Sequence, residues 1–192
     1  MNTTLMKDFF ISNGFSKESG ADFFRENNGF LNCINLQKKT TGDIFFINLG
    51  VHPIFAQINS QSLPKREIDC YIRTRLSTDE MLSIELLNSP NGVSLVIKEL
   101  EEKTWAFFDF FSSIDDVFSH LSIDNIKDGN IPAEFDSVTS VRLTSMCMNY
   151  NFLRGNIDVA RDFARYGLSI AGMAVGVKKD FKQVLKDTEN NI

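Results

Sequence analysis

Five amide and guanidinium side chains stand inside segments that otherwise have the composition of β-strands, and they are the residues best suited to chemistry in this chain. They are Asn35, Gln37, Asn48, Arg73 and Arg75. Polar groups of this kind need hydrogen-bonding partners when a sheet partly buries them, and a ligand can be such a partner. Because arginine and amide side chains bind carboxylate and phosphate oxygens well, these residues predict a surface for an anionic ligand or an acidic partner segment.

The same residues also allow a purely structural interpretation. Two arginines on one strand face repel each other unless a carboxylate or an anion lies between them. Asp69, Glu26 or a carboxylate from a helix could satisfy them within the protein, as partners within the protein usually do for partly buried charges. The sequence therefore leaves two hypotheses open, a binding surface and an internal network of ion pairs.

The chain has few of the residue patterns that are typical of catalysis or metal binding. His52 and His120 are the only histidines, and neither has a histidine or cysteine at the spacing typical of zinc ligands. The chain also has no G-x-S-x-G turn and no glycine-rich phosphate loop. We therefore expect neither a metal nor a cofactor, and we favour a protein without catalytic activity. The alternative is an enzyme acting on a phosphorylated or carboxylated substrate, with Arg73 and Arg75 orienting it and His52 as general acid or base.

Composition indicates a globular protein, since 43% of the 192 residues are hydrophobic and 23% are charged. The formal net charge of −5 gives no overall attraction to nucleic acid or to an anionic membrane, so we expect neither as a partner. Lys7 and Asp8 interrupt the first apolar patch, which argues against a signal peptide. Three widely spaced cysteines, Cys33, Cys70 and Cys147, favour reduced thiols and hence a cytoplasmic location.

The elements that must position the polar residues are the strands of a sheet. Residues 22–26, 30–38, 44–51 and 67–76 have strand composition, and the short connections between the first three favour an antiparallel meander. The two-residue period of a strand predicts one apolar face and an opposite face that carries the polar residues. The buried face is expected to include Phe45, Ile47, Leu49, Val51, Ile68, Cys70, Ile72, Thr74 and Leu76. We expect helices to cover that face and to leave the polar face partly open.

Periodic apolar residues predict the helices around this sheet. An amphipathic helix opens the chain and ends at a left-handed cap on Gly14. A long helix starts at Pro90 and presents an apolar stripe to the sheet. The stripe consists of Val93, Val96, Ile97, Leu100, Phe107, Phe108 and Phe111. A shorter helix is expected near residues 114–121, with acidic residues at its start.

The last part of the chain predicts a helical hairpin, with helices at 138–152 and 157–186 joined by a turn at Gly155. Asn156 stands where it can cap the second helix. A face of small residues on the second helix should allow another helix to approach closely. Its members are Ala160, Ala164, Gly167, Leu168 and Ala171. The turn and the alanines resemble one unit of a tetratricopeptide repeat, although at least three stacked units normally make such an array.

The predicted fold is α+β: an antiparallel meander sheet packed on helices, followed by a C-terminal helical hairpin. We expect a sheet domain at residues 1–121, an acidic linker at 122–136 and the hairpin at 137–192, packed on the sheet domain.

Several motifs of the first half occur in a fixed order. A helix ends in Gly-Phe, an N-x-Q strand holds Asn35 and Gln37, an N-x-G strand holds Asn48, and a C-x-x-R-x-R strand holds Arg73 and Arg75. In this order and spacing the chain resembles the bacterial family catalogued as domain of unknown function 4304, over roughly its first half. The resemblance implies an α+β sandwich and no established activity.

We expect a non-catalytic binding or interaction protein in a bacterial cytoplasm, with a protein partner or a small anionic ligand. An immunity- or antitoxin-like protein is one version of this expectation, because small acidic α+β proteins can mask a basic toxin surface electrostatically. The oligomeric state is left open.

Overall fold

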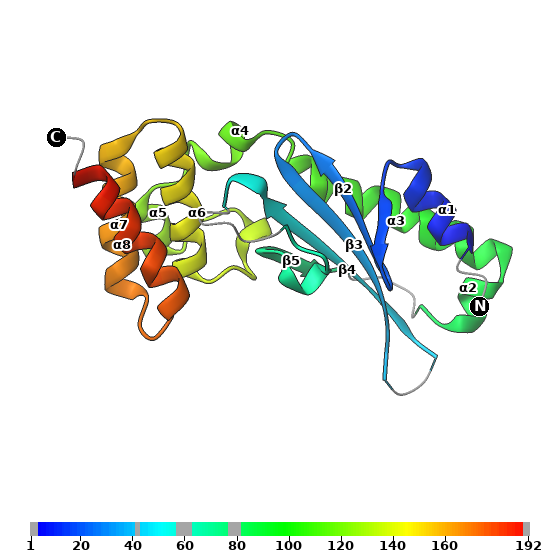
Figure 1. Cartoon of the computed structure of the whole chain (residues 1–192). Helices are drawn as coiled ribbons and strands as arrows, with labels where there is room; N and C mark the ends of the chain where they lie inside the picture. Colours follow the sequence, from blue (N-terminus) through cyan, green and yellow to red (C-terminus); the bar gives the residue numbers. More distant parts are fainter. Residues whose placement is uncertain (1–3, 41–42, 57–62, 77–81, 190–192) are drawn as a thin grey trace. The chain divides into compact units, whose positions relative to one another are not determined.

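The computed structural model describes residues 4–40, 43–56, 63–76 and 82–189. The chain forms two compact units (Figure 1). The first contains residues 1–52 and 64–112, and the second contains 53–63 and 113–192. The boundary in the second half of the chain thus lies at Ser112–Ser113, earlier than the boundary at residue 121 that the sequence indicated.

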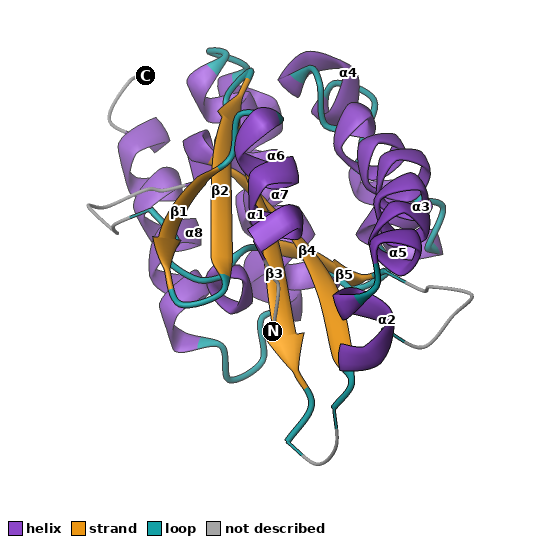
Figure 2. Cartoon of the chain, turned by 90° about the vertical axis from the view of Figure 1, so that its right-hand side faces the viewer, coloured by secondary structure: helices purple, strands orange, loops and turns teal. Residues whose placement is uncertain are grey.

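Within the described residues, five strands pair in their sequence order, and Figure 2 shows them side by side in one sheet. They are β1 (Ser16–Ser19), β2 (Asp22–Asn27), β3 (Phe30–Lys38), β4 (Phe45–Pro53) and β5 (Ile72–Arg75). The predicted antiparallel meander and the α+β class are confirmed. Strand β1 was not predicted, because its four residues, SKES, have no apolar alternation.

The fourth predicted strand, residues 67–76, is only partly a strand. Residues Glu67–Asp69 form a 3-10 turn, and β5 begins at Ile72. A turn does not follow the two-residue period of a strand, so Ile68 points outward and is 58% exposed instead of buried. Thr74, on a short strand at the edge of the sheet, is exposed as well, which also corrects the prediction.

The apolar face of the sheet forms the core of the first unit. Its β4 residues Phe45, Ile47, Leu49 and Val51 are buried. Helices α1 (Thr4–Ser12) and α3 (Pro90–Phe110) run alongside each other in Figure 1 and contribute to this core. Phe10 of α1 contacts Phe23 of β2, with ring centroids 5.1 Å apart. Phe30 of β3 contacts Phe111, which ends α3, at 5.6 Å.

Two details of the helices follow from local sequence. Gly14 adopts a φ of +83°, and the N–H of Phe15 donates to the carbonyl of Phe10, so the predicted left-handed cap is present. On α3 the buried stripe runs through Val96, Leu100, Thr104 and Phe108. Phe107 lies at the flank of this stripe and is less completely buried than Phe108, although its ring contacts those of Phe108 and Phe111. Helix α2 (Ile84–Asn88) precedes α3, and Ser89 caps α3 through its side chain.

The second unit is helical in its described residues. It contains α4 (Ile114–Phe118), α5 (Ile123–Asp128), α6 (Ser140–Leu153), α7 (Ile157–Ile170) and α8 (Val175–Glu189). The segment 122–136, expected to be a linker, holds α5. Ser122 and Asn125 form a capping box at the start of α5, and Ile126 is buried. This box was not predicted, because asparagine replaces the usual glutamate or glutamine.

The predicted helix 157–186 is interrupted, so that part of the prediction was wrong. Gly172, with a φ of +49°, lies in the turn that separates α7 from α8. The small-residue face of α7 does receive a neighbouring helix. A Cβ atom on Gly167 would stand 2.3 Å from the ring of Phe181 on α8, so only glycine fits there. Asn156 occupies the N-cap position of α7, but its side chain bonds to Asn151 and caps no backbone group.

Candidate binding site on the polar face of the sheet

Four polar side chains from four adjacent strands form a continuous row across the sheet. Asp22 on β2 pairs with Asn35 on β3, and Asn48 on β4 pairs with Arg75 on β5. Arg75 Nε donates to Asn48 Oδ1 at 2.9 Å, Asn48 Nδ2 to Asn35 Oδ1 at 3.2 Å, and Asn35 Nδ2 to Asp22 Oδ1 at 2.9 Å. Gln37 joins this polar row, because its Oε1 accepts a second bond from Asn48 Nδ2 at 3.1 Å.

The hydrogen bonds of the polar row all run in one direction, from the guanidinium of Arg75 to the carboxylate of Asp22. A cation at one end and an anion at the other favour a single orientation for the amides of Asn48 and Asn35 between them. Asn48 is 5% exposed and Asp22 8% exposed, so water competes little for these bonds. The polar row is therefore a pre-organised set of side chains on a rigid sheet.

The carboxylate partner of Arg73 is Glu67, which was not predicted from the sequence. Arg73 Nε lies 2.6 Å from Glu67 Oε1, and Arg73 Nη2 lies 3.1 Å from Glu67 Oε2. These hydrogen bonds raise the pKa of Arg73 above its usual value. The backbone N–H of Glu67 donates to Asp22 Oδ1 at 2.9 Å, which connects this ion pair to the polar row. Asp69, one of the predicted partners, pairs with Arg66 instead.

Arg75 is placed differently from Arg73. Its guanidinium lies over the ring of Phe46, 4.3 Å from the centroid, and its Nη2 donates to Gln37 Oε1 at 3.3 Å. Within the described part of the chain, Arg75 forms no ion pair with a carboxylate, and its Nη1 donates no hydrogen bond. Stacking and amide bonds thus fix the guanidinium while one edge stays available to a ligand.

A cavity of about 340 Å³ opens beside the polar row. It is lined by Ala21, Asp22, Asn35, Leu36, Gln37, Asn48, Arg66, Glu67, Ile68 and Arg73. The four charged side chains of this lining balance in sign, and both arginines have carboxylate partners. Asp22 Oδ2 accepts no hydrogen bond from the described residues, so the cavity keeps a free acceptor. A ligand in it would meet both donors and acceptors.

The structure thus brings together all five polar residues predicted from the strands, and it adds Asp22 and Glu67 to them. His52, the sixth candidate, is not among the residues that line the cavity. It is 3% exposed, and its ring packs on Tyr71 with centroids 4.5 Å apart. The register of the β2–β3 hairpin, fixed by the turn at Asn28 and Gly29, could have identified Asp22 as the residue opposite Asn35.

The cysteines lie in the protein interior. Cys33, Cys70 and Cys147 are free and buried. A Cβ on Gly50 would stand 2.9 Å from Cys70 Sγ and 3.4 Å from Cys33 Cβ, so both thiols flank the glycine of β4. Burial raises the pKa of the Cys33 thiol, and its hydrogen bond with Cys70 adds to this effect. No cluster of three or more potential metal ligands occurs among the described residues.

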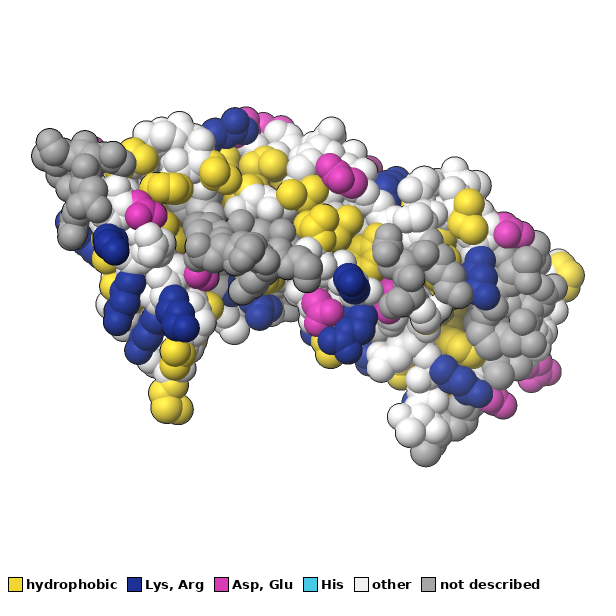
Figure 3. Space-filling view, in the orientation of Figure 1, with side chains coloured by type: hydrophobic (Ala, Val, Ile, Leu, Met, Phe, Trp, Pro, Cys, Tyr) yellow, Lys and Arg dark blue, Asp and Glu magenta, His cyan; other side chains and the backbone are white. Residues whose placement is uncertain are grey.

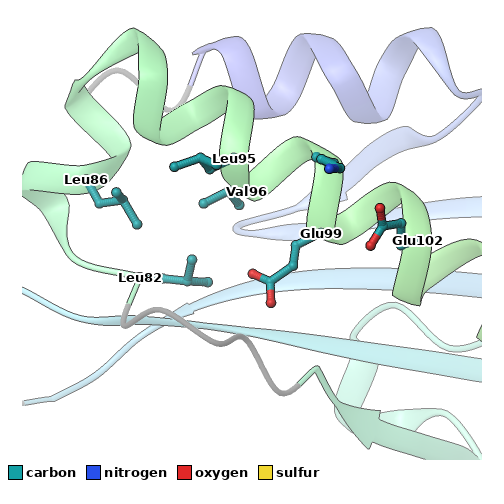
Figure 4. Close-up of a pocket in the computed structure, with 7 residues that line it drawn as sticks. Leu82, Leu86, Leu95, Val96, Glu99 and Glu102 are labelled. Atoms are coloured by element: carbon teal, nitrogen blue, oxygen red, sulfur yellow. The ribbon is translucent and has the colours of Figure 1, made fainter.

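A second hollow, of about 240 Å³, lies where α3 meets α2 and Leu82. Figure 4 shows Leu82, Leu86 and Val96 around one end of it and the carboxylates of Glu99 and Glu102 toward the other. Glu99 pairs with Lys103 on the same helix at 2.7 Å. This hollow has an apolar floor and few hydrogen-bonding groups in fixed positions, so it is the weaker candidate for a specific polar ligand.

The fold and the site define an α+β protein whose sheet carries a polar, hydrogen-bonded face beside a cavity. The family model described as Domain of unknown function (DUF4304) matches residues 6–109, more than half of the chain, and the chain belongs to this family. The matched segment contains the complete polar row and Glu67, so the candidate site lies within the family's domain. No curated protein and no solved structure matched the chain. No helix in the described ranges is long and apolar enough to cross a membrane.

Proposed function

We propose that this chain is a non-catalytic binding protein and that it holds an acidic segment of a partner, or a small anionic ligand, at the polar row. The single observation that carries the proposal is the placement of Arg75. Its guanidinium is stacked on Phe46 and bonded to Asn48 and Gln37, yet one edge has no protein partner among the described residues. A guanidinium edge fixed in this way suits a carboxylate or phosphate.

The cavity supports the same proposal from its chemistry. Arg73 is neutralised by Glu67, and Arg66 by Asp69, so neither attracts an anion as strongly as Arg75 does. The charge-balanced lining suits the uncharged polar part of a ligand, such as a peptide backbone, which carries donors and acceptors together. The acidic group of the ligand would then bind Arg75, which does not itself line the cavity but bonds to Asn48 and Gln37, which do.

The enzyme alternative has no support from this geometry. It uses His52 as general acid or base, but His52 is almost fully buried and does not line the cavity. An immunity- or antitoxin-like role remains a prediction from charge and fold class, and a cytoplasmic location remains a prediction that the free cysteines support. A toxin-like reading frame beside the gene would support the first of these.

Isothermal titration calorimetry tests the proposal with two probes, a hexaglutamate peptide and inorganic phosphate. At least one probe should bind the wild-type protein, and Arg75→Ala should weaken that binding strongly. Lys39→Ala is the matched control, because it removes an exposed cation outside the site. Absence of binding by both probes, or equal binding by wild type and Arg75→Ala, would contradict the proposed site.

A further inference from the structure

A second surface, separate from the polar row, lies on α8. Val175, Lys179, Lys182 and Lys186 follow one another at spacings of four, three and four residues. At about 3.6 residues per turn these positions fall in one stripe along the helix. All four side chains are exposed. We call them the α8 stripe.

The lysines of the α8 stripe are free to bind an external anion. Within the described residues, Lys179, Lys182 and Lys186 form no ion pair. By the helical period, Asp180 and Asp187 lie on a different side of α8 from the stripe, and Glu189 stands at the end of the stripe, three residues after Lys186. Asp187 accepts a hydrogen bond from Gln183 at 2.7 Å. The stripe is therefore a local positive surface on a protein of net negative charge, and the expectation of no membrane partner, which rests on that net charge, does not apply to this surface.

The turn before α8 adds apolar side chains to this surface. Met173 is 95% exposed and Val175 is 66% exposed. Gly172, with a positive φ, permits the tight turn that carries Met173. Figure 3 shows Lys and Arg side chains gathered over this part of the second unit, with hydrophobic side chains at its lower end. Apolar side chains exposed to this degree beside cations are typical of a surface that binds a partner.

We propose that the α8 stripe and Met173 bind the surface of an anionic lipid membrane peripherally. The lysines would lie among the headgroup phosphates, and Met173 and Val175 would enter the interface beside them, while the apolar face of α8, with Phe181 and Val184, stays packed in the protein. A nucleic acid would use the lysines but gain little from Met173 and Val175, since aromatic side chains bind its bases. A membrane surface would bind both the lysines and the apolar side chains.

The expected strength follows from the three exposed lysines. One lysine close to an anionic membrane raises the partition coefficient by about fivefold, so three raise it by about 100-fold. This attraction falls with salt, because the screening length is about 8 Å at physiological ionic strength. Replacing the apolar side chain of Met173 by a polar one should weaken binding further, by an amount that does not depend on salt.

Vesicle sedimentation with the full chain tests the proposal. Wild-type protein should sediment with phosphatidylcholine vesicles that contain about 30% phosphatidylserine, and much less with pure phosphatidylcholine. The triple variant Lys179→Gln, Lys182→Gln, Lys186→Gln should lose about 100-fold in partition, and Met173→Ser should lose several-fold at any salt concentration. The matched control changes three exposed lysines of the first unit, Lys39→Gln, Lys65→Gln and Lys98→Gln, and should bind as wild type does.

Three results would overturn the proposal. One is equal sedimentation with both kinds of vesicle, or none with either. Another is an equal loss in the control triple variant, which would show that only net charge matters. The third is an unchanged partition of Met173→Ser together with tighter binding of a single-stranded oligonucleotide, which would assign the stripe to a nucleic acid. Because every substituted side chain is exposed, circular dichroism should show that all variants fold.

Discussion

Replacing Arg73 and Arg75 separately should distinguish a structural ion pair from a binding residue. Arg73→Ala removes the partner of Glu67, whose side chain is almost fully buried, and strands its carboxylate. Breaking a buried pair in this way costs about 3–5 kcal/mol. The Arg73 side chain is 40% exposed, so water can solvate part of the stranded charge. We therefore expect a smaller loss of unfolding free energy, of about 2 kcal/mol.

Arg75→Ala should cost much less. Arg75 is exposed, and it gives up two hydrogen bonds to amide oxygens and a stacking contact with Phe46. Gln37 is exposed and can bond to water instead, and removal of the exposed Arg75 side chain lets water reach the otherwise buried Asn48, so we expect a loss below about 1 kcal/mol. Arg75 would then contribute little to folding, as expected for a residue kept for a ligand.

Urea denaturation followed by tryptophan fluorescence measures both losses. Trp105 is the single tryptophan, and it contacts Phe15 and Phe108 in the unit that holds the site. Glu67→Gln in the Arg73→Ala background should recover part of the loss, because it removes the stranded charge. Equal losses of about 2 kcal/mol for Arg73→Ala and Arg75→Ala would refute the reasoning and make the whole network structural.

Three further outcomes check the packing. Gly167→Ala should lower the unfolding free energy by about 2 kcal/mol or more, because the added methyl group overlaps with Phe181. Gly176 has open space around it, so Gly176→Ala should raise the unfolding free energy by up to about 1 kcal/mol. Equal effects of the two changes would refute the close contact of α7 with α8. Phe108→Ala should cost about 3–5 kcal/mol and half-buried Phe107→Ala less, as urea midpoints would show; the reverse order would contradict the stripe on α3. Burial raises the pKa of the Cys33 thiol, so the folded protein keeps this thiol protonated at pH values where the unfolded chain would ionise it. The contribution of the protonated thiol to the unfolding free energy is therefore complete below about pH 8.5, the pKa of an unfolded thiol, and is lost as the pH rises above it. Ellman's reagent should therefore react slowly with native protein but count three thiols in denaturant, and fast native reaction would exclude the buried arrangement.

The alternation of residues along a strand was enough to predict part of the polar row from the sequence. Asn35, Asn48 and Arg75 stand at alternate positions of strands whose other positions are mostly apolar, which places them on the same face. The partner of Arg73 could not be predicted in this way. Glu67 lies in a 3-10 turn before β5, and the path of that turn depends on tertiary contacts rather than on a period.

The helical part shows a similar limit. The face of small residues predicted a close helix contact, and Gly167 makes one with Phe181. The break at Gly172 was missed because Ala171, Met173 and Ala174 favour a continuing helix, although a glycine at this place is also a signal for a helix end. The contacts between α7 and α8 show that the second helix packs back on the first after this turn.

The central claim is that the polar row binds an anionic group at Arg75. The most direct measurement is a titration of ¹⁵N-labelled protein with the hexaglutamate peptide, followed by side-chain NMR signals. The Arg75 Nε–H signal and the amide signals of Asn35, Gln37 and Asn48 should shift together and saturate with one affinity. Arg75→Ala should abolish the shifts of the three amides. Shifts confined to residues outside the polar row, or amide shifts that persist in Arg75→Ala, would contradict the claim.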